Sequence, residues 1–271
     1  MRPVRSAPTH PLAHSTVVSI RSPVKWSFFG PATILEAPRR TAVRGPTFIR
    51  LLARLTDADV PPPPASLPDR LSQWIDWTRA VALSRALGGT LPVLDGNAPA
   101  FDSEEYAACQ RTRAGLTNTI TLATSNTPGA MLHAPAPVDF STFRQHYLAM
   151  QRAMQTATGK LRGQLRDRLA STSADMARLA EVDAMMEGVL SPREHRLLAA
   201  VPALLGQHFE RLQQVTQGHA TATRTEAWLE LFRRDMQGVL LAELDVRFLP
   251  IEGLLAALRT DPQGRHVQTS A

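Results

Sequence analysis

The stretch from Phe140 to Ala170, FSTFRQHYLAMQRAMQTATGKLRGQLRDRLA, carries the strongest structural signal in the sequence. Its apolar residues recur in alternating steps of three and four, the heptad spacing of a helix that presents an apolar seam to its neighbours. The seam consists of Phe140, Phe143, Tyr147, Met150, Met154, Ala157 and Leu161. Leu165 and Leu169 extend it in steps of four, a stutter that locally unwinds any supercoil. We therefore predict a long amphipathic, coiled-coil-like helix over residues 141–170.

Shorter apolar stripes with the same helical spacing flank this stretch on both sides. They predict further helices over residues 48–57, 66–88, 102–122, 176–189, 191–212, 223–248 and 251–258. Residues that favour helices are abundant, and no useful strand pattern follows residue 41. The sequence predicts an all-α fold, a helical bundle of long amphipathic helices with disordered termini.

Capping residues mark the starts of two predicted helices. Ser66 with Asp69, and Ser191 with Glu194, have the spacing of a capping box, in which a hydroxyl and a carboxylate satisfy amides at a helix start. Pro192 would then occupy the first position of its helix, where a proline is well tolerated. Capping also explains Glu194 more simply than a catalytic role does.

Two further prolines lie inside apolar stripes. Because proline lacks an amide hydrogen and crowds the preceding turn, it disrupts the interior of a helix. We expect Pro202 to kink or divide the stretch 191–212, and Pro250 to interrupt the last long helix before the short segment 251–258.

Composition divides the chain into five parts. They are a basic leader at residues 1–40, an N-terminal helical region at residues 41–122, a Pro/Gly-rich linker at residues 123–138, a long-helix bundle at residues 139–259 and a flexible tail at residues 260–271. The leader is rich in Pro, Ser and Arg without a sustained period, which predicts disorder. The same composition also fits a start-site artefact, in which the protein begins near Thr41.

Positive charge is concentrated at the N-terminus. Residues 1–50 carry eight basic groups and one acidic group, a net charge of +7, within a chain whose net charge is +6. The remaining residues carry 22 basic and 23 acidic groups, a net charge of −1. Because phosphate recognition needs clustered basic residues, this distribution argues against nucleic acid as a partner of the folded body.

The cysteine content and the hydropathy pattern indicate the compartment. Cys109 is the single cysteine, so the chain has no intramolecular disulfide and no CxxC metal knuckle. Its place on a helix favours a small apolar packing role over that of a nucleophile. No run approaches the roughly 18 apolar residues needed to span a bilayer, and prolines cut the N-terminal apolar stretches that a secretory signal would need. These features predict a cytoplasmic protein without a transmembrane segment.

No motif for catalysis, cofactor binding or metal binding is complete. His208 with Glu210 matches half of a zinc-deaminase pattern, but the Pro-Cys-x-x-Cys half is missing, so we interpret His208 as structural or exposed. The tripeptide 158–160, Thr-Gly-Lys, resembles the end of a phosphate-binding loop, yet Met154 stands where that loop requires glycine. We predict no catalytic, cofactor-binding or metal-binding residues and no cofactor.

The tryptophans fall into two groups. Trp74 and Trp228 lie on apolar stripes, which favours core packing over a stacking platform. Trp77 lies off that face, and we expect it to be partly exposed at a contact.

Two pairs of opposite charge stand four residues apart in the last long helix. They are Glu230 with Arg234 and Glu243 with Arg247, in the order that stabilises a helix. A solvated helix face explains both pairs, and a role in partner specificity is the alternative.

Four stretches resemble a proteobacterial family of unknown function, domain of unknown function family 3348. They are TAVRGPTFIRLLARLTDADV (41–60), LSQWIDWTRAVALS (71–84), SPREHRLLAAVPALL (191–205) and WLELFRRDMQGVLLAELDVRFLPIEGLLAAL (228–258). The resemblance covers about residues 41–259. Its motifs carry no known chemistry, so it implies no functional residues. Members lie beside genes for predicted envelope proteins, and the resemblance therefore points to a membrane-associated assembly.

These observations favour a non-enzymatic helical adaptor or scaffold that acts through protein-protein contacts, with a protein partner or by self-association. Such a protein would be cytoplasmic and peripheral to the inner membrane through its partner. A nucleic-acid-associated regulator that uses the basic N-terminal arm is the alternative. A third hypothesis is an enzyme whose site is assembled from scattered residues, which a deep pocket with converging titratable groups would favour.

Overall fold

The structure, a computed structural model, describes residues 46–57, 66–89, 103–125, 139–217 and 222–260, all within one compact unit formed by residues 41–271. The described residues form eight helices and no strand, which confirms the predicted all-α fold. The helices are α1 (Thr47–Thr56), α2 (Leu67–Trp74), α3 (Trp77–Gly88), α4 (Ser103–Ser125), α5 (Phe140–Thr172), α6 (Ala174–Leu198), α7 (Val201–Gln217) and α8 (Ala222–Thr260). The predicted leader at residues 1–40, most of the predicted linker and nearly all of the predicted tail lie outside the described residues.

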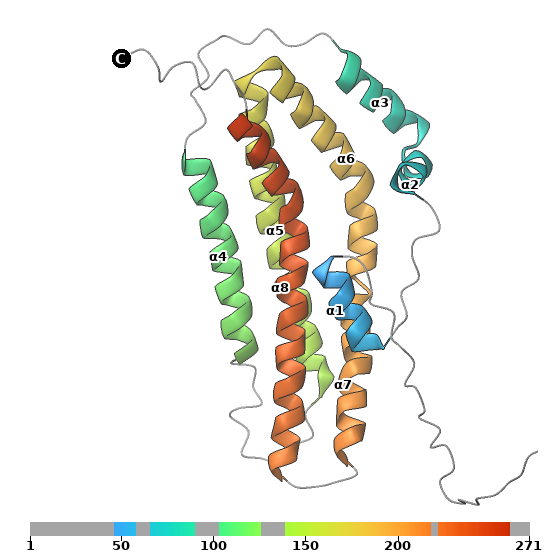
Figure 1. The fold of residues 1–271 in the computed structure, drawn as a ribbon, viewed down its shortest axis with the longest axis vertical. Coiled ribbons are helices and arrows are strands. Elements are labelled where there is room, and N and C mark those ends of the chain that lie inside the picture. The colour runs from blue at the N-terminus through green and yellow to red at the C-terminus, as the bar shows by residue number, and fades with distance from the viewer. Residues whose placement is uncertain (1–45, 58–65, 90–102, 126–138, 218–221, 261–271) are drawn as a thin grey trace, which may run out of the picture. The chain divides into compact units, whose positions relative to one another are not determined.

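Four long limbs form an up-and-down bundle, namely α4, α5, the consecutive helices α6 and α7, and α8 (Figure 1). Side-chain contacts show that α5 runs antiparallel to α6 and α7, because Arg162 meets Asp183 whereas the earlier Phe143 meets the later Phe209. α8 returns beside α7 and runs parallel to α5 (Figure 1). Each limb therefore buries one face against the others, as helical bundles do.

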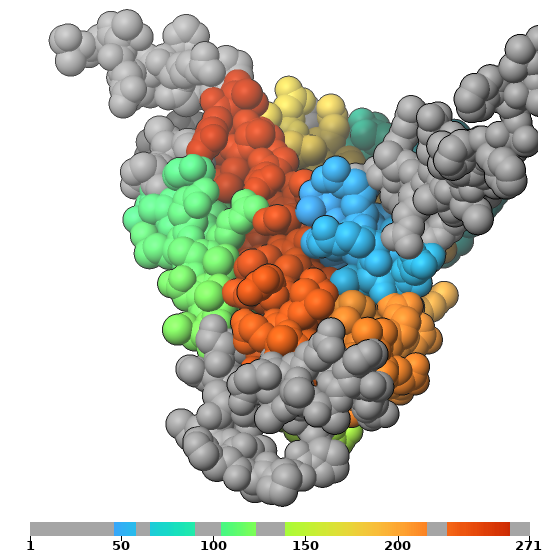
Figure 2. Space-filling model, turned by 60° about the horizontal axis from the view of Figure 1, so that its bottom comes forward, coloured from blue at the N-terminus to red at the C-terminus, as the bar shows by residue number. Residues whose placement is uncertain are grey.

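Three short helices pack on the outside of the bundle. α1 lies against α7 and α8 and buries Phe48 and Leu55. Arg211 of α7 donates hydrogen bonds to the carbonyls of Leu55 and Thr56, which have no helical partner at the C-terminus of α1. Figure 2 shows α8 lying between α1 and α4 on one face. α3 packs on α6.

The α5 seam forms one wall of the core. Its buried members are Phe143, Tyr147, Met154, Leu161, Leu165 and Leu169, and Phe140 and Met150 pack partly buried against them. α6, α7 and α8 of the same chain cover this face. The predicted long amphipathic helix is confirmed, and its apolar seam is covered inside the chain.

The stripe expected over residues 176–189 is only partly buried. Val189 is buried as predicted, but Leu179 remains 36% exposed. Ala177 and Ala180 take the buried positions instead.

Aromatic side chains fill the core beside the start of α5. They are Phe140, Phe143, Phe209, Trp228 and Phe232, with ring centroids 5.0–6.1 Å apart. Most pairs meet tilted or edge to face, the arrangement that aromatic quadrupoles favour. Gly206 makes room for them, since a Cβ there would lie 3.0 Å from the Phe140 ring. The predicted core position of Trp228 is confirmed.

The helix predicted over residues 66–88 is divided at Ile75 and Asp76. Its start is as predicted, because the Ser66 hydroxyl accepts a hydrogen bond from the Asp69 amide and the Asp69 carboxylate accepts one from the Ser66 amide. Ile75 is extended, and Asp76 caps a new helix by accepting a hydrogen bond from the Arg79 amide at 2.9 Å. The single-helix prediction was wrong because aspartate is itself a strong N-cap.

The helix start predicted at Ser191 is also wrong, because α6 passes through Pro192 without ending. The proline has no amide hydrogen, so the carbonyl of Gly188, four residues earlier, loses its helical partner. Arg79 of α3 replaces that partner, donating from Nη2 to the Gly188 carbonyl at 3.3 Å. A contact from a neighbouring helix thus helps α6 to accommodate the proline.

The other two prolines differ in their effect. Pro202 divides its stretch as predicted, since α6 ends at Leu198 and Pro202 is the second residue of α7. An amide at that position needs no helical acceptor. Pro250, in contrast, lies inside α8, and the predicted interruption there is wrong. Residues after it, including Ile251 and Leu254, are buried in the core and hold the helix in place.

We expect Pro192→Ala to raise the free energy of unfolding by about 1–3 kcal/mol, because it restores the helical amide at a mid-helix position. Urea denaturation of the purified protein measures this. Pro202→Ala is the matched control and should give no such gain, since its missing amide leaves no helical bond unmade. A Pro192→Ala protein no more stable than the control would contradict this account of α6.

Candidate functional site

A fully buried carboxylate lies at the centre of the bundle. Glu243 of α8 is 0% exposed. It accepts hydrogen bonds from Tyr147 Oη at 2.7 Å and from Gln151 Nε2 at 3.1 and 3.2 Å, both on α5. Arg247, one turn later on α8, donates to Glu243 Oε1 from Nε at 3.0 Å and from Nη2 at 2.8 Å. Burying a charge is costly unless it is paired and hydrogen-bonded, and Glu243 is both.

Gln151 connects this carboxylate to the end of α6. Its side-chain amide also donates to the carbonyl oxygen of Leu198, the last residue of α6, at 3.0 Å. Carbonyls in the last turn of a helix have no helical partner. Gln151 therefore caps α6 while it holds Glu243, and three limbs of the bundle meet at one polar point.

Tyr147 acts as a hydrogen-bond donor in this network. Burial, followed by the nearby negative charge of Glu243, raises the pKa of the Tyr147 phenol above its ordinary value. The phenol therefore keeps its proton at physiological pH and donates a hydrogen bond to the carboxylate.

The interpretation of Glu243 and Arg247 as a solvated pair is wrong, since both side chains are buried between helices. The other predicted pair also differs, because Glu230 contacts Arg233 at 3.8 Å.

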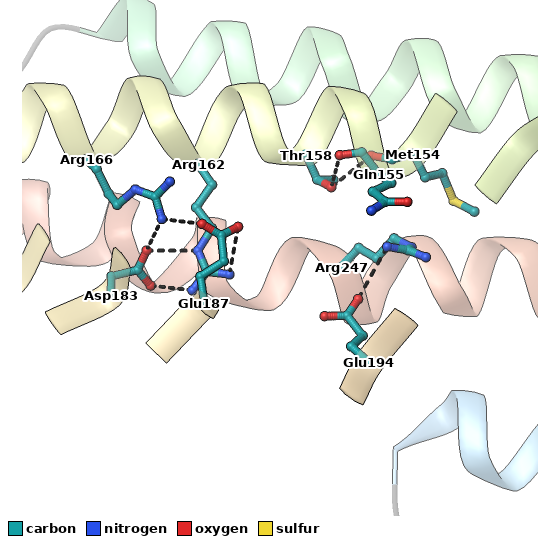
Figure 3. Close-up of polar contacts among 9 residues, drawn as sticks. All are labelled: Met154, Gln155, Thr158, Arg162, Arg166, Asp183, Glu187, Glu194 and Arg247. Carbon is teal, nitrogen blue, oxygen red and sulfur yellow. Dashed lines mark hydrogen bonds and ion pairs between the residues drawn. The ribbon is translucent and has the colours of Figure 1, made fainter. Parts of the chain in front are cut away.

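A second charged cluster joins α5 to α6 (Figure 3). Arg162 Nε and Nη2 donate to the two carboxylate oxygens of Asp183 at 2.8 and 2.6 Å. Arg166, one turn later on α5, hydrogen-bonds to Glu187 and lies 3.4 Å from Asp183. Burial lowers the pKa of Arg162, but the bonds to Asp183 and the charges of nearby carboxylates outweigh it, and the pKa is raised. Bidentate arginine–carboxylate pairs of this kind fix helix register.

A polar cleft of about 220 Å³ lies between these two clusters, at the junction of α5, α6 and α8. Its lining residues are Gln155, Thr158, Gly159, Arg162, Glu187, Ser191, Glu194, His195, Val246, Arg247 and Pro250. Glu194 of α6 accepts a hydrogen bond from Arg247 Nη1 of α8 at 3.3 Å (Figure 3). The cleft thus gathers titratable groups from three helices, and arginines pair with both of its lining glutamates.

Residues that disfavour helix surround this cleft. Gly159 of α5 and Pro250 of α8 line it, and Ser191 of α6 lines it beside Pro192. Glycine and proline each cost a helix interior stability relative to alanine, proline the more. Three limbs of one bundle carry such residues around the same opening, which marks it as the strongest candidate site, because departures from local rules concentrate at functional positions.

The structure places the other residues singled out in the sequence elsewhere. His208 of α7 pairs with Asp235 of α8, its Nε2 lying 2.9 Å from Asp235 Oδ2, and so links the two helices. Cys109 is buried between α4 and α8, where burial and the charge of Glu105 raise the pKa of its thiol. A thiol held in its neutral form is a poor nucleophile, as expected of a packing residue. Lys160 is exposed on α5, beside the cleft residue Gly159.

The three tryptophans that the sequence analysis singled out have distinct surroundings. Trp228 is buried in the aromatic cluster, whereas Trp74 is only half-buried and lies beneath the guanidinium of Arg193, 5.1 Å from the ring centroid. The core role expected for Trp74 is therefore wrong. Trp77, expected to be partly exposed, is 83% exposed.

Two further findings concern the described residues as a whole. Within the described ranges, no group of three or more His, Cys, Asp or Glu side chains could hold a metal ion. In the same part of the chain, no helix has both the length and the apolar character that crossing a membrane requires.

The model of the DUF3348 family, described as a protein of unknown function, matches residues 34–260. This chain belongs to that family. The match spans every described helix, and therefore the whole bundle and its cleft. No curated protein and no solved structure matches the chain.

The sequence analysis missed the polar centre of this DUF3348 protein, although one signal was present. Glu243 follows Leu240 by three residues and directly precedes Leu244, both of which lie on the apolar stripe of α8. Arg247 likewise follows Leu244 by three residues and directly precedes Phe248, which lies on the same stripe. Residues three and four apart share a helix face, so the pair had to point inward with its neighbours.

We expect Glu243→Ala to lower the free energy of unfolding by about 3–5 kcal/mol, because it leaves Arg247 buried without its main counter-charge. Tyr147 and Gln151 would lose their acceptor as well. Glu230→Ala, on the exposed face of the same helix, is the matched control and should cost less than about 1 kcal/mol. Chemical denaturation of both variants measures the difference, and equal losses would contradict the assigned role of Glu243.

Proposed function

We propose that this DUF3348 protein is a non-enzymatic helical adaptor or scaffold that acts through protein-protein contacts. The observation that carries the proposal is the exposure of Trp77 on the two-helix segment α2–α3. The apolar seam of α5 is covered by helices of the same chain, so the contact surface must lie elsewhere. We place it on α2–α3.

α2 and α3 bury very little within their own chain. α2 has no buried residue, and α3 has Ala86 alone. The large apolar side chains of Leu67, Trp77 and Leu87 are all exposed instead. Helices of this length are marginal in water unless they pack against something. A partner that covered α2–α3 would supply the packing that the chain itself does not.

Polar contacts hold this segment on the bundle. Arg79 donates to the carbonyl of Gly188, and Arg193 of α6 lies over the Trp74 ring. These contacts fix the position of α3 without covering Trp77, the first residue of that helix. An exposed tryptophan is typical of interface hot spots, because it offers a large contact area at little entropic cost.

The cleft supports a structural role better than a catalytic one. Its two lining glutamates are paired with arginines from other helices, as in charge networks that fix helix register. The proposal therefore includes the absence of enzymatic activity. It also places the protein in the cytoplasm, peripheral to the inner membrane through its partner, as the family resemblance suggested.

We expect Trp77→Ser to weaken partner binding by roughly thirtyfold or more, as truncation of a tryptophan hot spot does. The partner is first recovered with tagged protein from the native host, and its affinity for purified variants is then measured. Leu122→Ser is the matched control, since Leu122 is a 63% exposed side chain on α4. Equal affinities of the two variants and the unchanged protein would overturn the proposed surface, and loss of self-association in Trp77→Ser alone would identify the partner as a second copy.

The charge of residues 1–50 favours a second candidate, a nucleic-acid-associated regulator that uses its basic N-terminal arm. It predicts DNA binding that weakens steeply with salt and is lost when residues 1–40 are deleted, because those residues carry most of the excess charge. Fluorescence anisotropy with labelled duplex DNA at two salt concentrations tests this. Binding that survives the deletion, or that does not depend on salt, would rule out the arm as the contact.

A further inference from the structure

The arginines and carboxylates of the ion-pair network around the cleft between α5, α6 and α8 are unequal in number. Three guanidiniums, those of Arg162, Arg166 and Arg247, meet four carboxylates, those of Asp183, Glu187, Glu194 and Glu243. Arg162 forms a bidentate pair with Asp183, and Arg166 hydrogen-bonds to Glu187. Arg247 is then the only cation of this network that remains to pair with both Glu194 and Glu243.

Glu194 is the carboxylate left over. Glu243 takes both Nε and Nη2 of Arg247, at 3.0 and 2.8 Å, whereas Glu194 has only a contact with Nη1 at 3.3 Å. Glu243 is fully buried and also bound by α5, so it cannot release Arg247 without leaving a buried charge unpaired. The Glu194 side chain is 42% exposed and faces the cleft. It is therefore the group with capacity for a further positively charged donor.

The arginines of the cleft are unsuited to binding an anion. An incoming phosphate or carboxylate would compete with the carboxylates already bonded to Arg162 and Arg247, and it would meet the surplus negative charge. A cation has no such competition, because Glu194 has lone pairs available beyond its one contact.

The size and walls of the cleft suit a short aliphatic molecule. Its volume of about 220 Å³ exceeds the roughly 150 Å³ of an apolar cavity that binds benzene. Val246, Pro250 and the bare backbone of Gly159 provide apolar wall, and Gln155 and Ser191 provide polar groups. A Cβ at Gly159 would meet no atom within 4 Å, so the space beside this residue is open.

We propose that the cleft binds a small free organic cation, an aliphatic amine or guanidine, whose charged group pairs with Glu194. The chain of the ligand lies along Val246 and Pro250. This site does not depend on the proposed protein contact at Trp77, which is formed by other residues. Binding involves no covalent step.

The test is isothermal titration calorimetry of the full-length protein with agmatine, which carries an amine and a guanidinium on one short chain. Inorganic phosphate, titrated in the same way, serves as the anionic control ligand. We expect agmatine to bind and phosphate to give no binding heat. Glu194→Gln removes the surplus charge and should weaken agmatine binding at least about tenfold, as the loss of a charge-assisted hydrogen bond does.

Gly159→Leu fills the cleft without removing a polar group and should weaken binding to a similar extent. Gly163→Leu is its matched control, because Gly163 also has open space around it on α5 but does not line the cleft. This control should bind agmatine as the unchanged protein does. Absence of agmatine binding, binding of phosphate instead, or equal affinities of Glu194→Gln, Gly159→Leu and Gly163→Leu would each overturn the proposal. Urea midpoints of the variants confirm that each is folded.

Discussion

The buried carboxylate of Glu243 is the constraint on which the arrangement of the bundle depends. The apolar residues of α8 stand four apart over much of its length, as do Leu161, Leu165 and Leu169 on α5, so apolar packing alone would tolerate a slip of one turn between them. A slip would move Glu243 away from Tyr147 and Gln151 and leave a charge among apolar side chains, which is far more costly than a shifted leucine. A unique polar contact thus selects one register, as buried polar residues do in coiled coils.

Three limbs of the bundle depart from ideal helix chemistry at the level of the cleft. A side chain at Gly159 would occupy part of the opening, and Pro250 lines it with a compact ring. The cost of Pro192 is offset from outside the bundle, since Arg79 of α3 bonds to the carbonyl that the proline leaves without a partner. Local stability is therefore lowered where charged groups from α5, α6 and α8 must converge, and contacts between helices restore it.

The sequence was informative where burial follows periodicity and misleading where a single residue can serve two roles. The long helices α5 and α8 could be predicted, because one apolar face repeated over many turns has few alternatives. Asp76 within a helical stripe could have been an exposed side chain, and only the chain path shows it as an N-cap. Pro192 could have begun a helix as well as interrupted one, because the deciding group, Arg79, lies over a hundred residues away. The cleft escaped prediction for the same reason, since its residues are contributed by three separate helices.

Two turns of α6 connect the features on which the functional proposals rest. On one face, Glu187, Ser191 and Glu194 line the cleft. On another, the Gly188 carbonyl and Arg193 hold α3 and Trp74 of α2. An α-helix is stiff over so short a distance, so these groups move as one body. A displacement of α6 that opens or closes the cleft therefore also shifts the anchors of α2–α3. By thermodynamic reciprocity, whatever fixes α2–α3 acts back on the cleft with the same free energy.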